Sequence, residues 1–202
     1  NYSIWGNSNA TGIISGTALG NLSWTLLLTV TDNANANDTR SFVNFQSYNR
    51  YMLNVTSCVQ DANGCAINEV SLYNTTNQTP VPSFNNIKFN MTNDTAPLPY
   101  VTAASTVNTV NSSYGAFDNC GAPAGVCKGW LTSTGNITGW LTIDLGAGNA
   151  TNIENYTISV ETPDRGPRNW TLSGGNTYGT WTVLNTQTNI TGWVDTVNKT
   201  FN

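Results

Sequence analysis

Short extended segments separated by turn residues are the feature that most narrowly limits the fold of this chain. Runs rich in β-branched and aromatic side chains recur along the 202 residues, and each is bounded nearby by Gly, Asn, Asp or Pro. No stretch repeats apolar residues at helical spacing with capping signals. The pattern predicts an all-β antiparallel sandwich or barrel. The expected strands are 23–31, 41–45, 51–56, 69–73, 140–145, 156–160, 170–172 and 180–184.

Charge is scarce, and its scarcity excludes several classes of protein. The chain has 7 Lys and Arg, 11 Asp and Glu, no His and a net charge of −4. Seven cations cannot form the basic face that a nucleic-acid binder needs. Without His there is no His-ligated metal centre and no Ser-His or Cys-His nucleophile pair. We expect no enzyme, although the sequence leaves a glycosidase-type pair of carboxylates open. No apolar run is long enough for a transmembrane helix.

N-glycosylation acceptor sequences are unusually frequent. The pattern Asn-x-Ser/Thr occurs 16 times, whereas the composition alone would give about seven by chance. An Asn- and Thr-rich composition is the simpler explanation, but the excess favours a secreted glycoprotein whose glycans hydrate a poorly charged surface. The candidate sites are Asn1, Asn9, Asn21, Asn37, Asn54, Asn74, Asn77, Asn90, Asn93, Asn111, Asn136, Asn149, Asn155, Asn169, Asn189 and Asn198.

The four cysteines occur in two pairs with the same spacing. Cys58 and Cys65 are seven positions apart, as are Cys120 and Cys127, and both loops carry Gly and Asn or Pro. Four cysteines allow three pairings, and the equal short spacings favour the bridges Cys58–Cys65 and Cys120–Cys127. A four-cysteine zinc site is the alternative, but its ligand pairs are usually two to four residues apart. Disulfides indicate an oxidising, extracellular setting.

The two ends of the chain resemble each other. Residues 1–6 (Asn-Tyr-Ser-Ile-Trp-Gly) match 169–174 (Asn-Trp-Thr-Leu-Ser-Gly), and 24–27 match 181–184. Residues 40–42 then match 199–201, so the matches keep their order at a period near 160 residues. Chance similarity in a biased composition is the alternative, but three ordered matches favour the expectation that the chain begins and ends within the same kind of unit.

Several motifs in the second half carry a family resemblance. They are Ala-Phe-Asp-Asn at 116–119, Trp-Leu-Thr-Ser at 130–133, Gly-Trp-Leu-Thr-Ile-Asp-Leu-Gly at 139–146, Arg-Asn-Trp-Thr-Leu-Ser-Gly at 168–174 and Thr-Trp-Thr-Val-Leu at 180–184. They resemble the opening part of the discoidin, or coagulation factor five/eight type C, family of galactose-binding-like jelly rolls. Residues 42–55 and 66–73 resemble the closing strands of the same domain. The order departs from the family, because the closing strands come first.

This order implies a division of the chain. We expect 1–75 to be the C-terminal portion of one discoidin-like unit and 100–202 the N-terminal portion of the next. Between them, 76–99 would be a linker with four prolines, able to form one more strand within 85–91. Neither portion covers its own strands, so the jelly-roll sandwich would be completed by strands from a neighbouring copy. That copy is the next tandem repeat or an identical subunit. A circular permutant is the alternative, but it leaves 1–42 unused.

The resemblance also implies candidate ligand sites. Family members often hold a structural calcium ion in the loop matching 116–119, which here implies Asp118 together with Glu69. No cofactor is expected to be required. Sugar binding at loop residues is the family's common activity, and the possible positions are Tyr114, Trp193, Arg165 and Arg168. The alternative for such aromatic residues is packing in the core, which we expect for Trp140, Trp170 and Trp181.

Together these observations predict a structural role. We expect a secreted, heavily N-glycosylated subunit or repeat of an extracellular filament, with identical copies and covalent glycans as its partners. Head-to-tail contacts that do not close on themselves build fibres. The alternative is a lectin-like, carbohydrate-binding adhesion module at the cell surface.

Overall fold

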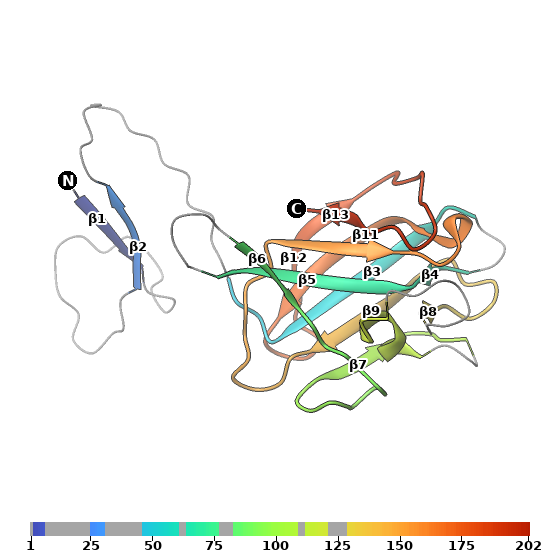
Figure 1. Cartoon of the computed structure of the whole chain (residues 1–202), viewed down its shortest axis with the longest axis horizontal. Helices are drawn as coiled ribbons and strands as arrows, with labels where there is room; N and C mark the ends of the chain where they lie inside the picture. The colour runs from blue at the N-terminus through green and yellow to red at the C-terminus, as the bar shows by residue number, and fades with distance from the viewer. Residues whose placement is uncertain are drawn as a thin grey trace. The chain divides into compact units, whose positions relative to one another are not determined.

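Antiparallel strands make up nearly all of the regular structure, as the sequence predicts (Figure 1). The computed structural model describes residues 2–6, 25–30, 46–60, 64–76, 83–108, 112–120 and 129–202. Every expected strand in these ranges is confirmed, whereas 41–45 lies outside them. Two 3-10 turns, η1 (Ser113–Phe117) and η2 (Pro163–Arg165), are the helical elements of the described part. No helix there combines the length and apolar character needed to cross a membrane.

The described strands form two larger sheets and two pairs. The five-stranded sheet has the order β12-β11-β3-β9-β7, and the four-stranded sheet has the order β13-β10-β5-β6. The pairs are β1-β2 and β4-β8. The bounds are β1 Tyr2–Gly6, β2 Thr25–Val30, β3 Arg50–Cys58, β4 Ala66–Ile67, β5 Glu69–Thr76, β6 Ser83–Ile87, β7 Val101–Ala104, β8 Trp130–Leu131, β9 Gly139–Asp144, β10 Asn155–Ser159, β11 Pro167–Gly175, β12 Thr182–Gln187 and β13 Lys199–Phe201.

The core lies between the two larger sheets, as in a β-sandwich. Alternate residues of β3 are buried, among them Leu53 and Val55, because successive side chains of a strand point to opposite faces. β5 and β10 supply Leu72 and Ile158 to the same cluster from the other sheet. Trp170 of β11 is also buried there, with 1% of its surface exposed. The opposite face of the five-stranded sheet therefore carries the polar residues of β3 and β9.

The strands between 50 and 76 pair with later strands of the same chain. β3 lies between β11 and β9, and β5 lies between β10 and β6. The chain accordingly divides into one compact unit of residues 1–44 and another of residues 45–202. This division differs from the expected one at 75 and 100. The segment expected to be a linker contributes β6 to a sheet and buries Phe89 and Met91 in the core.

The unit of residues 1–44 contains the hairpin β1-β2, and its pairing repeats that of β11-β12. Tyr2 pairs with Val30, as Trp170 pairs with Gln187. The register shifts between Ile4 and Trp5, and it shifts at the matching position, between Leu172 and Ser173, in β11. After the shift, Gly6 pairs with Thr25 as Gly174 pairs with Thr182. The sequence duplication therefore extends to backbone pairing, including a β-bulge, which is a specific local feature.

Candidate functional sites

A pair of carboxyl groups, Glu69 and Asp118, is the most unusual electrostatic feature of the described residues. Glu69 begins β5, Asp118 follows η1, and the two carboxyl groups lie close enough to affect each other's charge. Burial, followed by the negative charge of Asp118, raises the pKa of Glu69 to about 9. Burial also raises the pKa of Asp118. The second oxygen of Glu69, Oε2, is buried and has no hydrogen-bond partner in the structure.

The turn that holds Asp118 is fixed by another carboxylate. Asp94 Oδ1 accepts hydrogen bonds from the Ser113 hydroxyl at 2.5 Å, the Thr102 hydroxyl at 2.9 Å and the Tyr114 amide at 3.0 Å. These bonds fix the first turn of η1 against β7. Asp118 Oδ1 in turn accepts the Cys120 amide at 2.8 Å. The sequence resemblance implied that Glu69 and Asp118 come together from two copies, whereas the structure brings them together within one chain.

Of the two expected disulfides, one has both of its cysteines among the described residues and the other has only one. Cys58 and Cys65 are joined at the end of β3, with their Cα atoms 5.7 Å apart. The sulfur of Cys120 is also in a disulfide, but Cys127 lies outside the described residues. The Cys58–Cys65 bridge connects the five-stranded sheet to the segment that leads into β4. It therefore limits how far β3 and β4 can separate.

Ten of the sixteen candidate glycosylation sites lie within the described residues. Six of them are exposed and three are half-buried. The exposed ones are Asn90, Asn93, Asn136, Asn149, Asn189 and Asn198, and the half-buried ones are Asn54, Asn74 and Asn169. Asn1, Asn9, Asn21, Asn37, Asn77 and Asn111 lie outside the described residues. Most of the described acceptor residues are thus accessible to solvent.

Asn155 is the exception, because the folded unit leaves little room for a glycan there. Its side chain is 9% exposed and that of Thr157, in the same acceptor sequence, is 6% exposed. Both belong to β10, which lies between β5 and β13. When the chain is expressed in a glycosylating host, we expect Asn155 to be unmodified in the folded protein while Asn198 is occupied. Site-resolved mass spectrometry of glycopeptides checks this, and a substantial glycan-bearing fraction at Asn155 would contradict it.

The four possible sugar-binding residues are not all available to a ligand. Trp193, a possible loop residue for sugar binding, is 5% exposed and donates from Nε1 to the Pro167 carbonyl at 3.0 Å. A side chain at Gly166 would overlap its ring, so the glycine makes room for Trp193. Arg165 belongs to η2, and Arg168 contacts Asn189 Oδ1 at 3.4 Å. Tyr114 belongs to η1 and packs against the core.

A hollow on the outer face of the five-stranded sheet was not predicted. It has a volume of about 410 Å³, and Trp140, Asn54 and Asn136 line it. Trp140 was expected in the core, but it is only half-buried. A signal for this was present in the sequence, because Leu141 and Ile143 alternate with Trp140 and occupy the buried face of β9.

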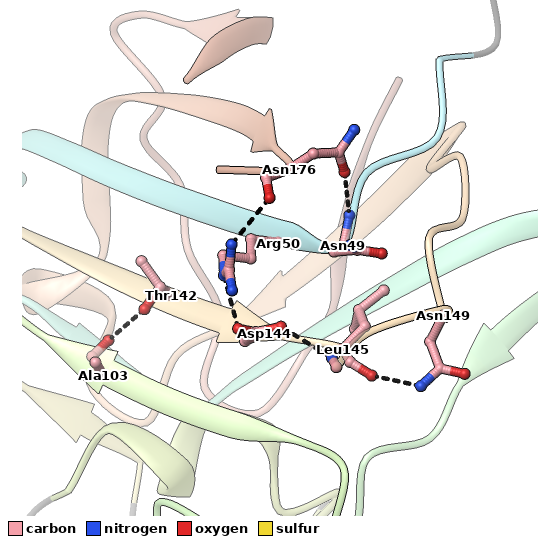
Figure 2. A network of polar contacts seen from close by, with 9 residues as sticks. Asn49, Arg50, Ala103, Thr142, Asp144, Leu145, Asn149 and Asn176 are labelled. Atoms are coloured by element: carbon pink, nitrogen blue, oxygen red, sulfur yellow. Dashed lines mark hydrogen bonds and ion pairs between the residues drawn. The ribbon is translucent and has the colours of Figure 1, made fainter. Parts of the chain in front are cut away.

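A polar network at the other end of β3 and β9 has a structural role (Figure 2). Arg50 Nε donates to Asp144 Oδ2 at 2.6 Å, and Arg50 Nη1 donates to the Asn176 carbonyl at 3.1 Å. Asp144 Oδ1 accepts the amide of Gly146 at 2.9 Å. Both oxygens of Asp144 are thus engaged within the fold. Arg50 connects Asp144 of β9 to β3 and to the turn after β11.

Known proteins offer no relative from which to read a role for these sites. No family model matches the chain, and neither a curated protein nor a solved structure is detectably similar to it.

Proposed function

We propose that this chain is a structural subunit or repeat of a secreted, heavily N-glycosylated extracellular filament that is assembled head-to-tail. The observation that carries the proposal is the β1-β2 hairpin, which repeats the pairing and bulge of β11-β12. In the larger unit, the free edge of such a hairpin is covered by β3, which pairs along β11. Within the described residues, β1 has β2 as its sole strand partner.

The duplication supplies a way to connect copies. The two hairpins have the same register, so either of them can pair with the strand β3. The β1-β2 hairpin of one copy can therefore take the place of the β11-β12 hairpin of another. Such strand addition uses main-chain hydrogen bonds for affinity. The contact is heterologous, since a hairpin meets a different surface of its neighbour, and repetition of such contacts produces fibres. The jelly-roll type of the sandwich and its completion by a neighbouring copy are parts of this proposal.

The glycosylation expected from the sequence supports the same role. The acceptor residues in the described part are mostly exposed, and charged residues are only 9% of the chain. Dense glycans would hydrate the surface of a fibre and protect it from proteases. A disulfide at Cys58–Cys65 fits an oxidising, extracellular location.

A proline in β1 tests the assembly. Ser3→Pro removes a backbone donor and strains the hairpin, and β1 belongs to a different compact unit from residues 45–202. We expect the purified chain to form regular fibres in negative-stain electron microscopy and the Ser3→Pro variant to remain monomeric. Sedimentation velocity measures the same loss of assembly in solution.

The control for this experiment is Asn198→Gln, which removes one exposed acceptor residue far along the chain from the hairpin. It is expected to assemble as the unmodified sequence does. Fibres formed by Ser3→Pro at an unchanged rate would refute the role of the hairpin. A natural chain that stays monomeric at high concentration would refute the filament itself.

Within the same proposal, Glu69 and Asp118 are the residues that would hold calcium. Two carboxylates in contact and a buried oxygen without a partner suit a hard cation, which prefers oxygen ligands. A bound ion would supply positive charge where two negative groups meet. We expect millimolar calcium to raise the melting temperature at pH 8 and to have no such effect on Glu69→Gln. An equal rise in melting temperature for both proteins would contradict the site. Magnesium in place of calcium is a further control.

The carbohydrate-binding alternative is less well supported. It needs several exposed loop residues around one ligand, yet Trp193 is buried and Tyr114 packs against the core. A glycan array is the direct test. Binding that Arg168→Ala abolishes would favour an adhesion module over a structural role.

A further inference from the structure

The hollow on the outer face of the five-stranded sheet brings a tryptophan and two glycosylation sequences together. In the pairing of β3 with β9, Asn54 lies directly opposite Trp140. Directly opposed residues of antiparallel strands have Cβ atoms about 4.5–5.5 Å apart and share one face of the sheet. Leu53 and Leu141, the pair next to them, are buried, so Asn54 and Trp140 belong to the outer face.

Both acceptor sequences contribute their two functional residues to the lining. Asn54 and Thr56 come from β3, whereas Asn136 and Thr138 come from the segment just before β9. The two sequences are 82 positions apart in the chain and meet only because β3 and β9 are neighbours. The hollow is therefore bordered by two points at which a sugar chain can be attached.

The lining suits the chemistry of the first sugar of an N-linked glycan. One face of a pyranose ring presents C–H groups that pack on an aromatic ring, and Trp140 offers such a ring half-exposed. Ser105, Thr106 and Thr138 line the same hollow, and hydroxyl side chains of this kind bond to sugar hydroxyl or acetamido groups. A volume of about 410 Å³ lies within the range of small-molecule sites.

Two hydrogen bonds to Ser105 hold the Trp140 backbone in place. Its amide donates to Ser105 Oγ at 2.9 Å, and its carbonyl accepts the Ser105 amide at 2.9 Å. Asn54 differs from Asn74 and Asn169, whose side-chain nitrogens donate to Thr151 Oγ1 at 3.1 Å and Ser57 Oγ at 2.6 Å. Within the described part of the chain, no hydrogen bond engages the Asn54 side chain. Its nitrogen is free to carry a glycan.

We propose that Trp140 is the docking platform for the glycan attached to Asn54, whose first N-acetylhexosamine lies in this hollow. The inference rests on the N-glycosylation in the proposed function, but it requires neither filaments nor calcium. It gives the half-buried Trp140 a role that differs from recognition of a foreign sugar. The glycan at Asn136 would lie at the edge of the same hollow.

The test uses the full chain secreted by a host that adds high-mannose glycans. An endoglycosidase that cuts between the two core N-acetylglucosamines is applied to the folded protein, and release is followed for each site by mass spectrometry. We expect release at Asn54 to be about threefold to tenfold slower than at the exposed Asn198, since stacking on Trp140 opposes access. Trp140→Leu keeps an apolar side chain without the aromatic face, and it is expected to remove most of the difference.

A second readout identifies the sugar that occupies the hollow. Ring currents of Trp140 should shift the acetamido methyl signal of one N-acetylhexosamine upfield in the proton spectrum. The shifted signal is expected to disappear in both Trp140→Leu and Asn54→Gln, and to persist in Asn136→Gln. Tyr178→Ala, at an aromatic residue that is 74% exposed and absent from the hollow, should leave it unchanged.

Three results would overturn the inference. Release at Asn54 as fast as at Asn198 would show that the glycan is not docked. A shifted signal that survives Asn54→Gln would assign the hollow to another glycan, either that of Asn136 or that of a second copy. An unoccupied Asn54 beside occupied exposed sites would remove the ligand, while leaving the proposed function in place. Absence of glycans at all sites would instead refute the glycosylated filament.

Discussion

Replacing Trp170 with alanine is expected to destabilise the larger unit by about 3–5 kcal/mol. The indole is 1% exposed, and its Nε1 donates to the Tyr156 hydroxyl at 2.9 Å. Its ring lies 4.9 Å from that of Phe201 and 6.2 Å from that of Trp193, measured between centroids. The substitution would leave a cavity between the sheets and deprive the buried Tyr156 hydroxyl of a donor.

Chemical denaturation at pH 6 measures this loss, which is a large part of the about 5–15 kcal/mol that stabilises a typical domain. Trp170→Phe keeps much of the volume and is expected to lose less than the alanine variant. Tyr178→Ala is the matched control, because Tyr178 is 74% exposed, and a change within about 0.5 kcal/mol is expected. A loss of less than about 1 kcal/mol for Trp170→Ala would show that the core is packed differently.

The second large effect is a fall in stability as the pH rises. Because burial raises the pKa of Glu69 to about 9, the folded unit retains a proton that the unfolded chain loses near the ordinary value of 4.5. The stabilisation is complete below about pH 4.5 and is lost progressively as the pH approaches 9. The limiting slope for one proton is about 1.4 kcal/mol per pH unit. Partial exposure of Glu69 to solvent reduces this slope. We therefore expect the free energy of unfolding to fall by about 2–4 kcal/mol between pH 5 and pH 8.

Glu69→Gln isolates this contribution, since the amide keeps the shape of the side chain but does not ionise. Urea denaturation in the presence of a chelator should show a flatter profile for Glu69→Gln, which should also be the more stable protein at pH 8. Asp195→Asn, at an exposed carboxylate, is the control and should follow the unmodified sequence. If the profiles of all three proteins coincided, Glu69 would ionise as an ordinary surface carboxyl group does.

The candidate sites show what residue patterns can and cannot predict. The contact between Glu69 and Asp118 was anticipated from a family resemblance, and the Cys58–Cys65 bridge from equal spacing in two loops. The burial of Trp193 was missed, because the residue lies in an irregular segment and its position depends on space left by Gly166. The outward position of Trp140 was also missed, although the alternation in β9 contained the information. An aromatic residue in a strand is not evidence of a core position until it is known on which face of the sheet the residue lies.

The amino-acid sequence by itself determined where the longest strands form, which cysteines are close neighbours, and that the two ends of the chain resemble each other. These are local properties, since alternation, turn residues and short spacings depend on residues near one another. Only the tertiary structure decided which strands are partners: that β3 lies between β11 and β9, and that 45–202 is one unit. Many strands with similar patterns can pair in several orders, and the choice depends on which order buries one continuous core. The same strand order places Asn54 opposite Trp140, and no local sequence pattern predicts that pairing.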